Sequence, residues 1–213
     1  MKFLLRYFML LLFSNIKFMQ AKALGKLGEA MVEFHVWLYL NSKYMLLNDL
    51  TLKLQSGNTT QIDHILLSPY GIFVIETKNY KGVIRGNADD QKWKQVLGKN
   101  TYEIYNPIMQ NETHVRVVKN LLQGLNAYEH VHNLVVFTSR SKHKRDWFGF
   151  GKKLPENVCH GSRWVKYVKR HKKKVLSKDQ LAEIQERIET RMLNQNILTD
   201  TKHVINIKLR KFR

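Results

Sequence analysis

Apolar side chains in residues 21–40 recur at the spacing of a helix. They fall three or four positions apart, which places five of them on one face: Leu24, Leu27, Met31, Phe34 and Leu38. The opposite face holds Glu29 among three further apolar side chains, Val32, Val36 and Leu40. Since such a helix is apolar on two sides, we expect it to be buried.

Strand-like patterns follow this helix. Runs rich in β-branched and aromatic residues predict strands over 44–54, 61–67 and 71–78, with shorter strands or turns at 82–87 and 101–106. Residues 91–97 are only weakly patterned. Pro107 suits the first position of a helix, which we expect to run to about Ala127.

The second half of the chain returns to alternating elements. Residues 132–138 form a short, nearly all-apolar run, which is typical of a central strand. Ser177 and Gln180 match a capping box, which predicts a helix over 178–194, and residues 203–209 alternate like a last strand. The order of elements predicts an α/β (α+β) fold, with a mixed β-sheet core flanked by helices on both faces.

Charged residues interrupt the two runs that we expect to form a hairpin around Ser68–Gly71. If Leu67 lies opposite Ile72, counting back along both strands places Asp63 opposite Glu76. Directly opposite side chains hold their Cβ atoms about 5 Å apart, and like charges at that distance are destabilising. Unpaired carboxylates in an apolar sheet also carry a large desolvation penalty. Something must therefore neutralise the pair.

Three ways of neutralising the pair are open. One carboxylate is protonated, Lys78 on the same strand face pairs with both, or a divalent cation sits between them. The simplest structural alternative is a Lys78–Glu76 pair at a sheet edge with Asp63 solvated. We favour the cation, because two carboxylates plus water suit Mg²⁺ or Mn²⁺, which can activate a water molecule for attack on a phosphate.

The first 20 residues are distinct from the rest. Residues 3–13 are apolar apart from Arg6, but the run is shorter than the roughly 20 residues that span a bilayer. The small-residue cleavage site of a signal peptide is also poor. We therefore expect residues 1–20 to form an apolar helix that either packs on the domain or lies at a membrane interface.

Charge narrows the choice of partner. The chain carries 36 Lys and Arg against 17 Asp and Glu, a formal net charge of +19. Fourteen of the basic residues lie between Arg140 and Lys178, where there are only two acids. An anionic partner, nucleic acid or an anionic membrane, is therefore expected. The one cysteine, Cys159, excludes an intrachain disulfide and favours a reducing compartment, hence a cytoplasmic or membrane-peripheral protein.

Four stretches with a joint spacing carry a family resemblance. They are GKLGE (25–29), QIDHILLSPYGIFVIETKNYKGVIRG (61–86), the Trp at 93 and NPIMQNETHV (106–115). Together they resemble the NERD (nuclease-related) domain and the wider PD-(D/E)XK nuclease superfamily. The resemblance implies a restriction-endonuclease-like fold, with the nuclease core over 21–140. The resemblance does not cover residues 141–213, which we expect from their charge to form a basic C-terminal extension packed on the core.

The resemblance also assigns roles to individual residues. Asp63 and Glu76 would bind Mg²⁺ or Mn²⁺, and Lys78 would position the attacking water or the scissile phosphate. Glu29 would be an additional metal or water ligand from the first helix, and Gln110 the polar helix residue near the site. The expected function is a metal-dependent endo- or exonuclease that hydrolyses phosphodiester bonds of DNA.

Two other functions compete with this one. A nuclease fold without activity could hold nucleic acid through its basic C-terminal third, or the protein could be membrane-peripheral through residues 1–19 and 163–174. Candidate nucleic-acid contacts share a basic charge in this third: Lys142, Lys144, Arg145, Lys152, Lys153, Lys169, Arg170, Lys172 and Lys173. His64 faces away from Asp63, so we expect it to be a packed or solvated histidine, and Cys159 to be an inert thiol.

Overall fold

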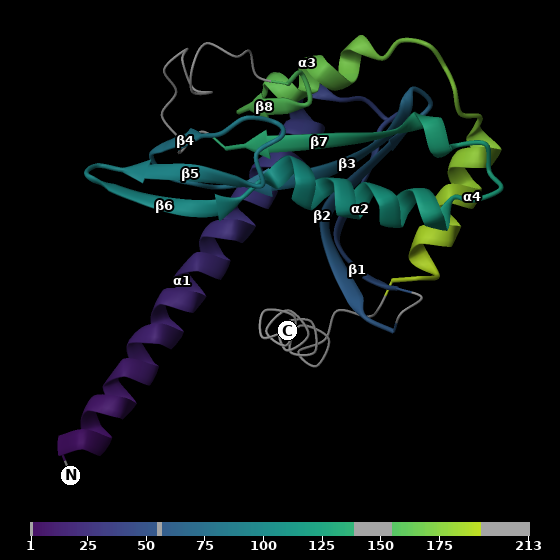
Figure 1. Cartoon of the computed structure of the whole chain (residues 1–213). Coiled ribbons are helices and arrows are strands. Elements are labelled where there is room, and N and C mark those ends of the chain that lie inside the picture. Colours follow the sequence, from purple (N-terminus) through teal and green to yellow (C-terminus); the bar gives the residue numbers. More distant parts are fainter. Residues whose placement is uncertain (1, 55–56, 139–154, 193–213) are drawn as a thin grey trace.

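The computed structural model of the chain describes residues 2–54, 57–138 and 155–192 (Figure 1). The helices are α1 (Lys2–Tyr39), α2 (Pro107–Leu121), α3 (Arg163–Arg170) and α4 (Lys178–Glu189), with a short 3₁₀ turn at Tyr128–His130. The strands are β1 (Met45–Lys53), β2 (Thr59–Ser68), β3 (Gly71–Lys78), β4 (Val83–Arg85), β5 (Lys92–Leu97), β6 (Asn100–Tyr105), β7 (Val131–Phe137) and β8 (Val158–His160).

The strands form a mixed sheet and a smaller antiparallel one. The main sheet has the order β1-β2-β3-β7-β8, in which β1, β2 and β3 are antiparallel neighbours and β3, β7 and β8 run parallel. The second sheet has the order β4-β5-β6 and packs through Trp93 and Ile84 against Phe137 at the end of β7. β3 lies at the centre of the main sheet, where antiparallel pairing changes to parallel pairing.

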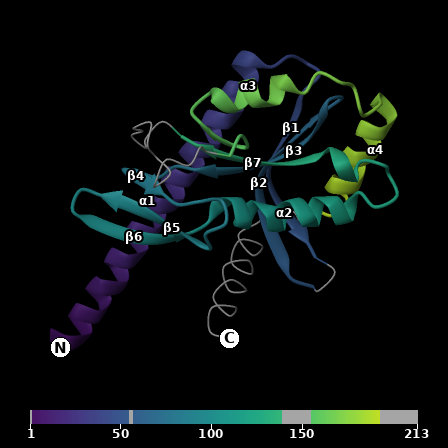
Figure 2. The same cartoon turned by 45° about the horizontal axis from the view of Figure 1, so that its top comes forward.

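Helices cover both faces of the main sheet (Figure 1, Figure 2). On one face, α2 and α4 pack through Val118 and Ile184 against Ile65 and Val74. On the other, α1 and α3 pack through Val32, Trp164 and Val168 against the alternate side chains of β2 and β3, such as Phe73. Because side chains alternate along a strand, one buried sheet supplies both apolar cores. The predicted mixed α+β fold is confirmed.

Helix α1 departs from the expectation that it is buried. It runs unbroken from Lys2 to Tyr39, and its N-terminal half extends away from the sheet (Figure 1, Figure 2). Val32 is buried, but the face that carries Leu27, Phe34 and Leu38 is about half exposed to solvent. That expectation was wrong because only the Val32 face meets the sheet. Over the residues that the structure describes, no helix has the length and apolar character needed to cross a bilayer.

Several element boundaries differ from the sequence expectations. Helix α2 ends at Leu121, six residues early, because Gly124 and Asn126 both have positive φ and turn the chain towards β7. Helix α4 ends at Glu189 instead of continuing to 194. Strand β8, of three residues, was not predicted at all, and the strand expected at 203–209 lies outside the described residues.

Candidate active site

The hairpin of β2 and β3 has the register that the sequence predicted. Leu67 pairs with Ile72 and His64 pairs with Ile75, so Asp63 and Glu76 lie one position beyond the regular ladder. There Asp63 Oδ2 accepts a hydrogen bond from the Thr77 backbone N–H at 2.7 Å. Alternation along the strands directs Asp63 and Glu76 to the face that α2 covers. The two carboxylates are therefore neighbours beneath α2.

Glu76 is 3% exposed and is held by two side chains. Lys78 Nζ donates to Glu76 Oε1 at 2.5 Å and to Gln110 Oε1 at 2.9 Å. Gln110 Nε2 in turn donates to Glu76 Oε1 at 2.8 Å. Gln110 thus holds the ammonium and the carboxylate of the strand in one arrangement, and it comes from α2 as expected. A buried ion pair needs such additional hydrogen bonds to offset desolvation.

The second oxygen of Glu76 is not hydrogen-bonded. His114, one turn after Gln110 on α2, places Nδ1 3.3 Å from Glu76 Oε2. The contact lacks hydrogen-bond geometry, so both atoms are buried without a hydrogen-bond partner among the described residues. Leaving a buried carboxylate oxygen unsatisfied is unfavourable, and native structures rarely do so without a functional reason. Glu76 Oε2 therefore faces His114 Nδ1 without a well-formed hydrogen bond.

Protonation differs between the two carboxylates. Burial raises the pKa of Asp63 to about 8, and the adjacent Glu76 carboxylate adds to this effect. Burial also works to raise the pKa of Glu76, but the Lys78 ammonium and His114 outweigh it and hold that pKa below its usual value. Burial alone would lower the pKa of Lys78, yet the Glu76 carboxylate raises it above normal. Near neutral pH, Lys78 neutralises Glu76 and a proton neutralises Asp63.

Comparison with known proteins identifies the family of this chain. The nuclease-related domain (NERD) family matches residues 24–138, just over half of the chain, including every residue of the site. The chain belongs to this family. An uncharacterized protein of Bacillus anthracis is 35% identical over 99 residues, which are 46% of this chain and 47% of that protein. The chain thus spans about half the length of this relative. No solved structure matches significantly.

Helix α1 of the nuclease-related domain brings Glu29 to the strand ends through Gly28. A Cβ at Gly28 would lie 3.0 Å from Asn79 Cβ and 3.3 Å from methyl groups of Thr77 and Thr138. A side chain at position 28 would therefore crowd the strand ends unless its neighbours shifted. Burial, reinforced by Asp49, raises the pKa of Glu29, and the charge of Glu29 in turn contributes to the raised pKa of Asp63. Glu29 thus shares the electrostatic environment of the site.

Asp49 of β1 lies beside the candidate site and was not predicted from the sequence. It falls between the pairs Asn48–His64 and Leu50–Ile62, opposite Asp63, and has a φ of 49°. This left-handed conformation is uncommon for a residue other than glycine. Asp49 accepts hydrogen bonds from Gln61 at 2.6 Å and from Lys26 of α1 at 3.5 Å. No local sequence signal marked it, because an Asp in a strand usually indicates solvent exposure.

His64 and Cys159, which we expected to have no role in catalysis, lie where expected. His64 is fully buried, with Nδ1 2.9 Å from Asn48 Oδ1, and burial lowers its pKa to about 4. It is a packed, neutral histidine on the opposite strand face. Burial raises the pKa of Cys159 to about 11, which keeps the thiol protonated.

The basic residues expected to contact nucleic acid separate into two groups. Five of them, Lys142, Lys144, Arg145, Lys152 and Lys153, lie outside the described residues. The other four, Lys169, Arg170, Lys172 and Lys173, lie at or just after the end of α3, which covers the sheet face opposite α2. Arg170 there forms an exposed pair with Glu156 at 3.5 Å. The structure does not bring these four together with Asp63 and Glu76.

The donor set suits a hard divalent cation. Glu76 Oε2 accepts no hydrogen bond from a described residue, and Asp63 accepts one through Oδ2 from the Thr77 backbone. Over the described ranges, no three His, Cys, Asp or Glu side chains converge as a complete metal cage. Mg²⁺ in nucleotide-processing sites is usually bound by one or two carboxylates, with waters and substrate phosphate filling the other positions. The two neighbouring carboxylates of Asp63 and Glu76 fit that requirement.

Proposed function

We propose that this protein is a metal-dependent nuclease that hydrolyses phosphodiester bonds of DNA. The observation that carries the proposal is the half-buried Asp63 beside the buried Glu76, with the Lys78 ammonium held on Glu76. A structural ion pair would need only Glu76 and Lys78. The second carboxylate raises the electrostatic free energy of the site, and clusters of this kind are typical of functional sites.

Asp63 and Glu76 would hold Mg²⁺ or Mn²⁺, with Glu29 as an additional ligand to the metal or to a water. When bound, the cation would supply charge for the phosphate oxygens and lower the pKa of a water molecule. Asp63 must lose its proton before it can bind a cation. The raised pKa of Asp63 therefore makes cation binding depend on pH.

Lys78 contributes a fixed positive charge. Its Nζ is anchored on Glu76 and Gln110, so the ammonium is oriented before a substrate arrives. A preorganised cation aimed at developing negative charge stabilises a transition state without reorganisation during the reaction. Gln110 is a positioning residue in this arrangement, because it acts through Lys78 and Glu76.

Cleavage of plasmid and linear DNA with Mg²⁺ or Mn²⁺ tests the proposal, with an RNA of equal length as a second substrate. Glu76→Gln and Asp63→Asn preserve side-chain shape and should each abolish cleavage, while Lys78→Ala should lower it strongly. Glu103→Gln removes an exposed carboxylate that pairs with Lys92 on the second sheet, and should change nothing. Thermal melting curves establish that each variant is folded. If Glu76→Gln and Asp63→Asn cleave as fast as the parent, the assignment is wrong.

The net charge of +19 favours a second candidate, a nucleic-acid-binding module without activity. Such a module would bind DNA in a salt-dependent manner, because counterions are released when basic residues contact phosphates. Its binding would survive Asp63→Asn and Glu76→Gln, with no cleavage under any cation. Binding and cleavage assays on the same variants separate the two functions.

A further inference from the structure

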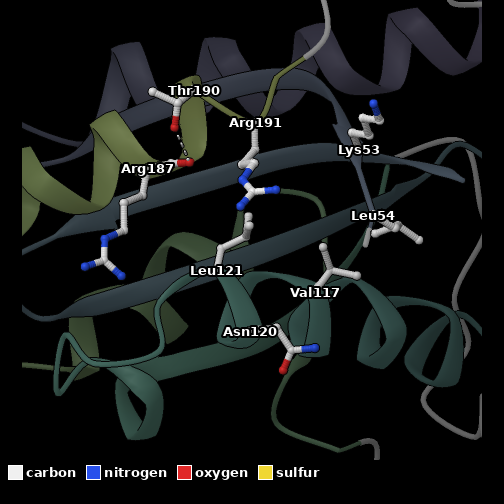
Figure 3. A pocket seen from close by; sticks show the side chains of 8 residues that line it. All are labelled: Lys53, Leu54, Val117, Asn120, Leu121, Arg187, Thr190 and Arg191. Atoms are coloured by element: carbon white, nitrogen blue, oxygen red, sulfur yellow. Dashed lines mark hydrogen bonds between the residues drawn. The ribbon is translucent and has the colours of Figure 1, made fainter. Parts of the chain in front are cut away.

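A basic groove of about 640 Å³ lies at the opposite end of α2 from Gln110 (Figure 3). It is bounded by the chain just after α4, by the end of β1 and by the C-terminal half of α2. Leu54, Val117 and Leu121 form its apolar wall. Asp63 and Glu76 are not part of it, so the groove is separate from the candidate active site.

The charged lining of the groove is entirely positive. Lys53, Arg187 and Arg191 line it, and no carboxylate does so among the described residues. Lys53 and Arg191 are exposed, and neither forms an ion pair with a described carboxylate. Figure 3 shows the Arg191 side chain extending from the end of α4 towards Leu121 on α2. Two cations are therefore available to an anion that enters the groove.

Backbone contacts join the two segments that carry Lys53 and Arg191. Lys53 N–H donates to Arg191 O at 3.3 Å, and Leu52 and Met192 form a β-bridge. Arg187 is held by hydrogen bonds to Gln123 O and to Glu183, both at 2.9 Å. The end of β1 and the end of α4 are thus joined without help from the side chains of Lys53 and Arg191. Substituting those two side chains leaves the walls of the groove intact.

Helix α2 connects the groove with the candidate active site. Gln110, His114, Val117 and Leu121 follow one another at steps of four, three and four residues, so they share one flank of the helix. Gln110 and His114 reach Glu76, whereas Val117 and Leu121 line the groove. At 1.5 Å per residue, about 16 Å separates Gln110 from Leu121. This is about five base-pair steps along a B-form duplex.

We propose that the groove binds backbone phosphate of the nucleic-acid strand that leads away from the Asp63–Glu76 site along α2. This inference rests on the proposed function for the direction of the strand, but its binding test does not require cleavage. Arg191 and Lys53 contact the phosphates, and the apolar wall lets the sugar edge of the strand approach closely. Contacts of this kind position a substrate and carry no sequence information.

The test measures binding of a labelled 20-base-pair duplex in EDTA, between 50 and 200 mM salt. The groove variant Lys53→Ala/Arg191→Ala is compared with Lys94→Ala/Lys99→Ala, which removes the same charge from two exposed positions of the second sheet, in β5 and in the β5–β6 turn. Each lost phosphate contact lowers the slope of log affinity against log salt by about 0.9. We expect the groove variant to lose between one and two units of slope and about tenfold or more in affinity. The control pair should lose less than threefold.

The proposal is overturned if the groove variant binds the duplex as tightly as the parent, or if the control pair weakens binding equally. It is also overturned if the parent binds inorganic phosphate through Arg191 while the groove variant binds the duplex normally. The last result would make the groove a site for small phosphates. Because EDTA removes the cation, binding is measured whether or not the parent cleaves DNA. If the parent does cleave, the groove variant should raise KM and leave kcat unchanged. A protein that does not cleave DNA can therefore be distinguished from a groove that does not bind DNA.

Discussion

The raised pKa of Asp63 makes the stability of the metal-free protein fall with rising pH. In the unfolded chain the Asp63 carboxyl has its ordinary pKa of 3.8, whereas in the folded protein burial and Glu76 raise it to about 8. Between these values the folded state binds a proton that the unfolded state does not. Stability therefore decreases as pH rises through this window, by at most about 1.4 kcal/mol per pH unit.

The Asp63→Asn variant isolates this effect. The amide cannot ionise, yet its oxygen can still accept the Thr77 N–H. For a pKa of about 8, the Asp63 contribution to the free energy of unfolding falls by about 2 kcal/mol from pH 6 to pH 8. We therefore expect Asp63→Asn to gain about 2 kcal/mol over the parent across that interval. Contributions of other titrating groups are common to both proteins and cancel in the difference.

Urea unfolding in EDTA at pH 6, 7 and 8 measures the difference directly. Asp89→Asn is the matched control, because Asp89 is exposed in a loop and should show no pH-dependent difference from the parent. Saturating Mn²⁺ should flatten the pH dependence of the parent above pH 7, since the bound cation takes the place of the proton. A difference between Asp63→Asn and the parent that stays constant within about 0.5 kcal/mol would refute the raised pKa of Asp63.

Three further predictions address the rest of the site and α1. Gly28→Ala should destabilise the protein by about 1–3 kcal/mol in urea unfolding, because the helix is pushed off the strand ends, whereas Gly25→Ala, with open space around it, should be neutral or gain up to about 1 kcal/mol. Equal effects of the two substitutions would contradict the close approach of α1. Lys78→Met should cost about 3–5 kcal/mol, since it leaves the buried Glu76 charge unpaired, and the loss should shrink in acid as Glu76 takes up a proton. Deleting residues 1–19 should abolish co-sedimentation with anionic vesicles while the melting temperature is kept; unchanged sedimentation would exclude this segment as an interfacial anchor.

The sequence predicted the hairpin and its carboxylates because strand register is tightly constrained. Ser68–Gly71 sets the turn, and a slip by one residue would turn every apolar side chain of the pair to the wrong face. Asp63 and Glu76 could therefore be paired by counting. Gln110 and Glu29 could not be placed by counting, since each lies on a helix whose distance from the sheet depends on tertiary packing. Their assignment came from the family resemblance.

Features that depend on packing across the whole molecule could not be predicted from the sequence. Asp49 has a left-handed backbone conformation at a position opposite Asp63, and nothing within the sequence of β1 indicates it. The buried face of α1 was ambiguous, because Val32 and Leu27 lie on two similarly apolar faces and only the sheet decides which is covered. Strand β8 is three residues long and pairs with β7 at its end, too short to show a periodicity.

The placement of α3 changes where nucleic acid should bind. Charge density alone pointed to Lys169, Arg170, Lys172 and Lys173, yet α3 covers the sheet face opposite the one that carries Glu76. A strand with its scissile phosphate at Glu76 and its neighbours along α2 approaches the groove of Lys53 and Arg191 instead. Replacing all four α3-side cations by Ala removes twice the charge of the groove variant. It should nevertheless raise KM for DNA cleavage less than the groove variant does. A larger effect of the α3-side variant would mean that the strand leaves the site around the sheet edge, towards α3.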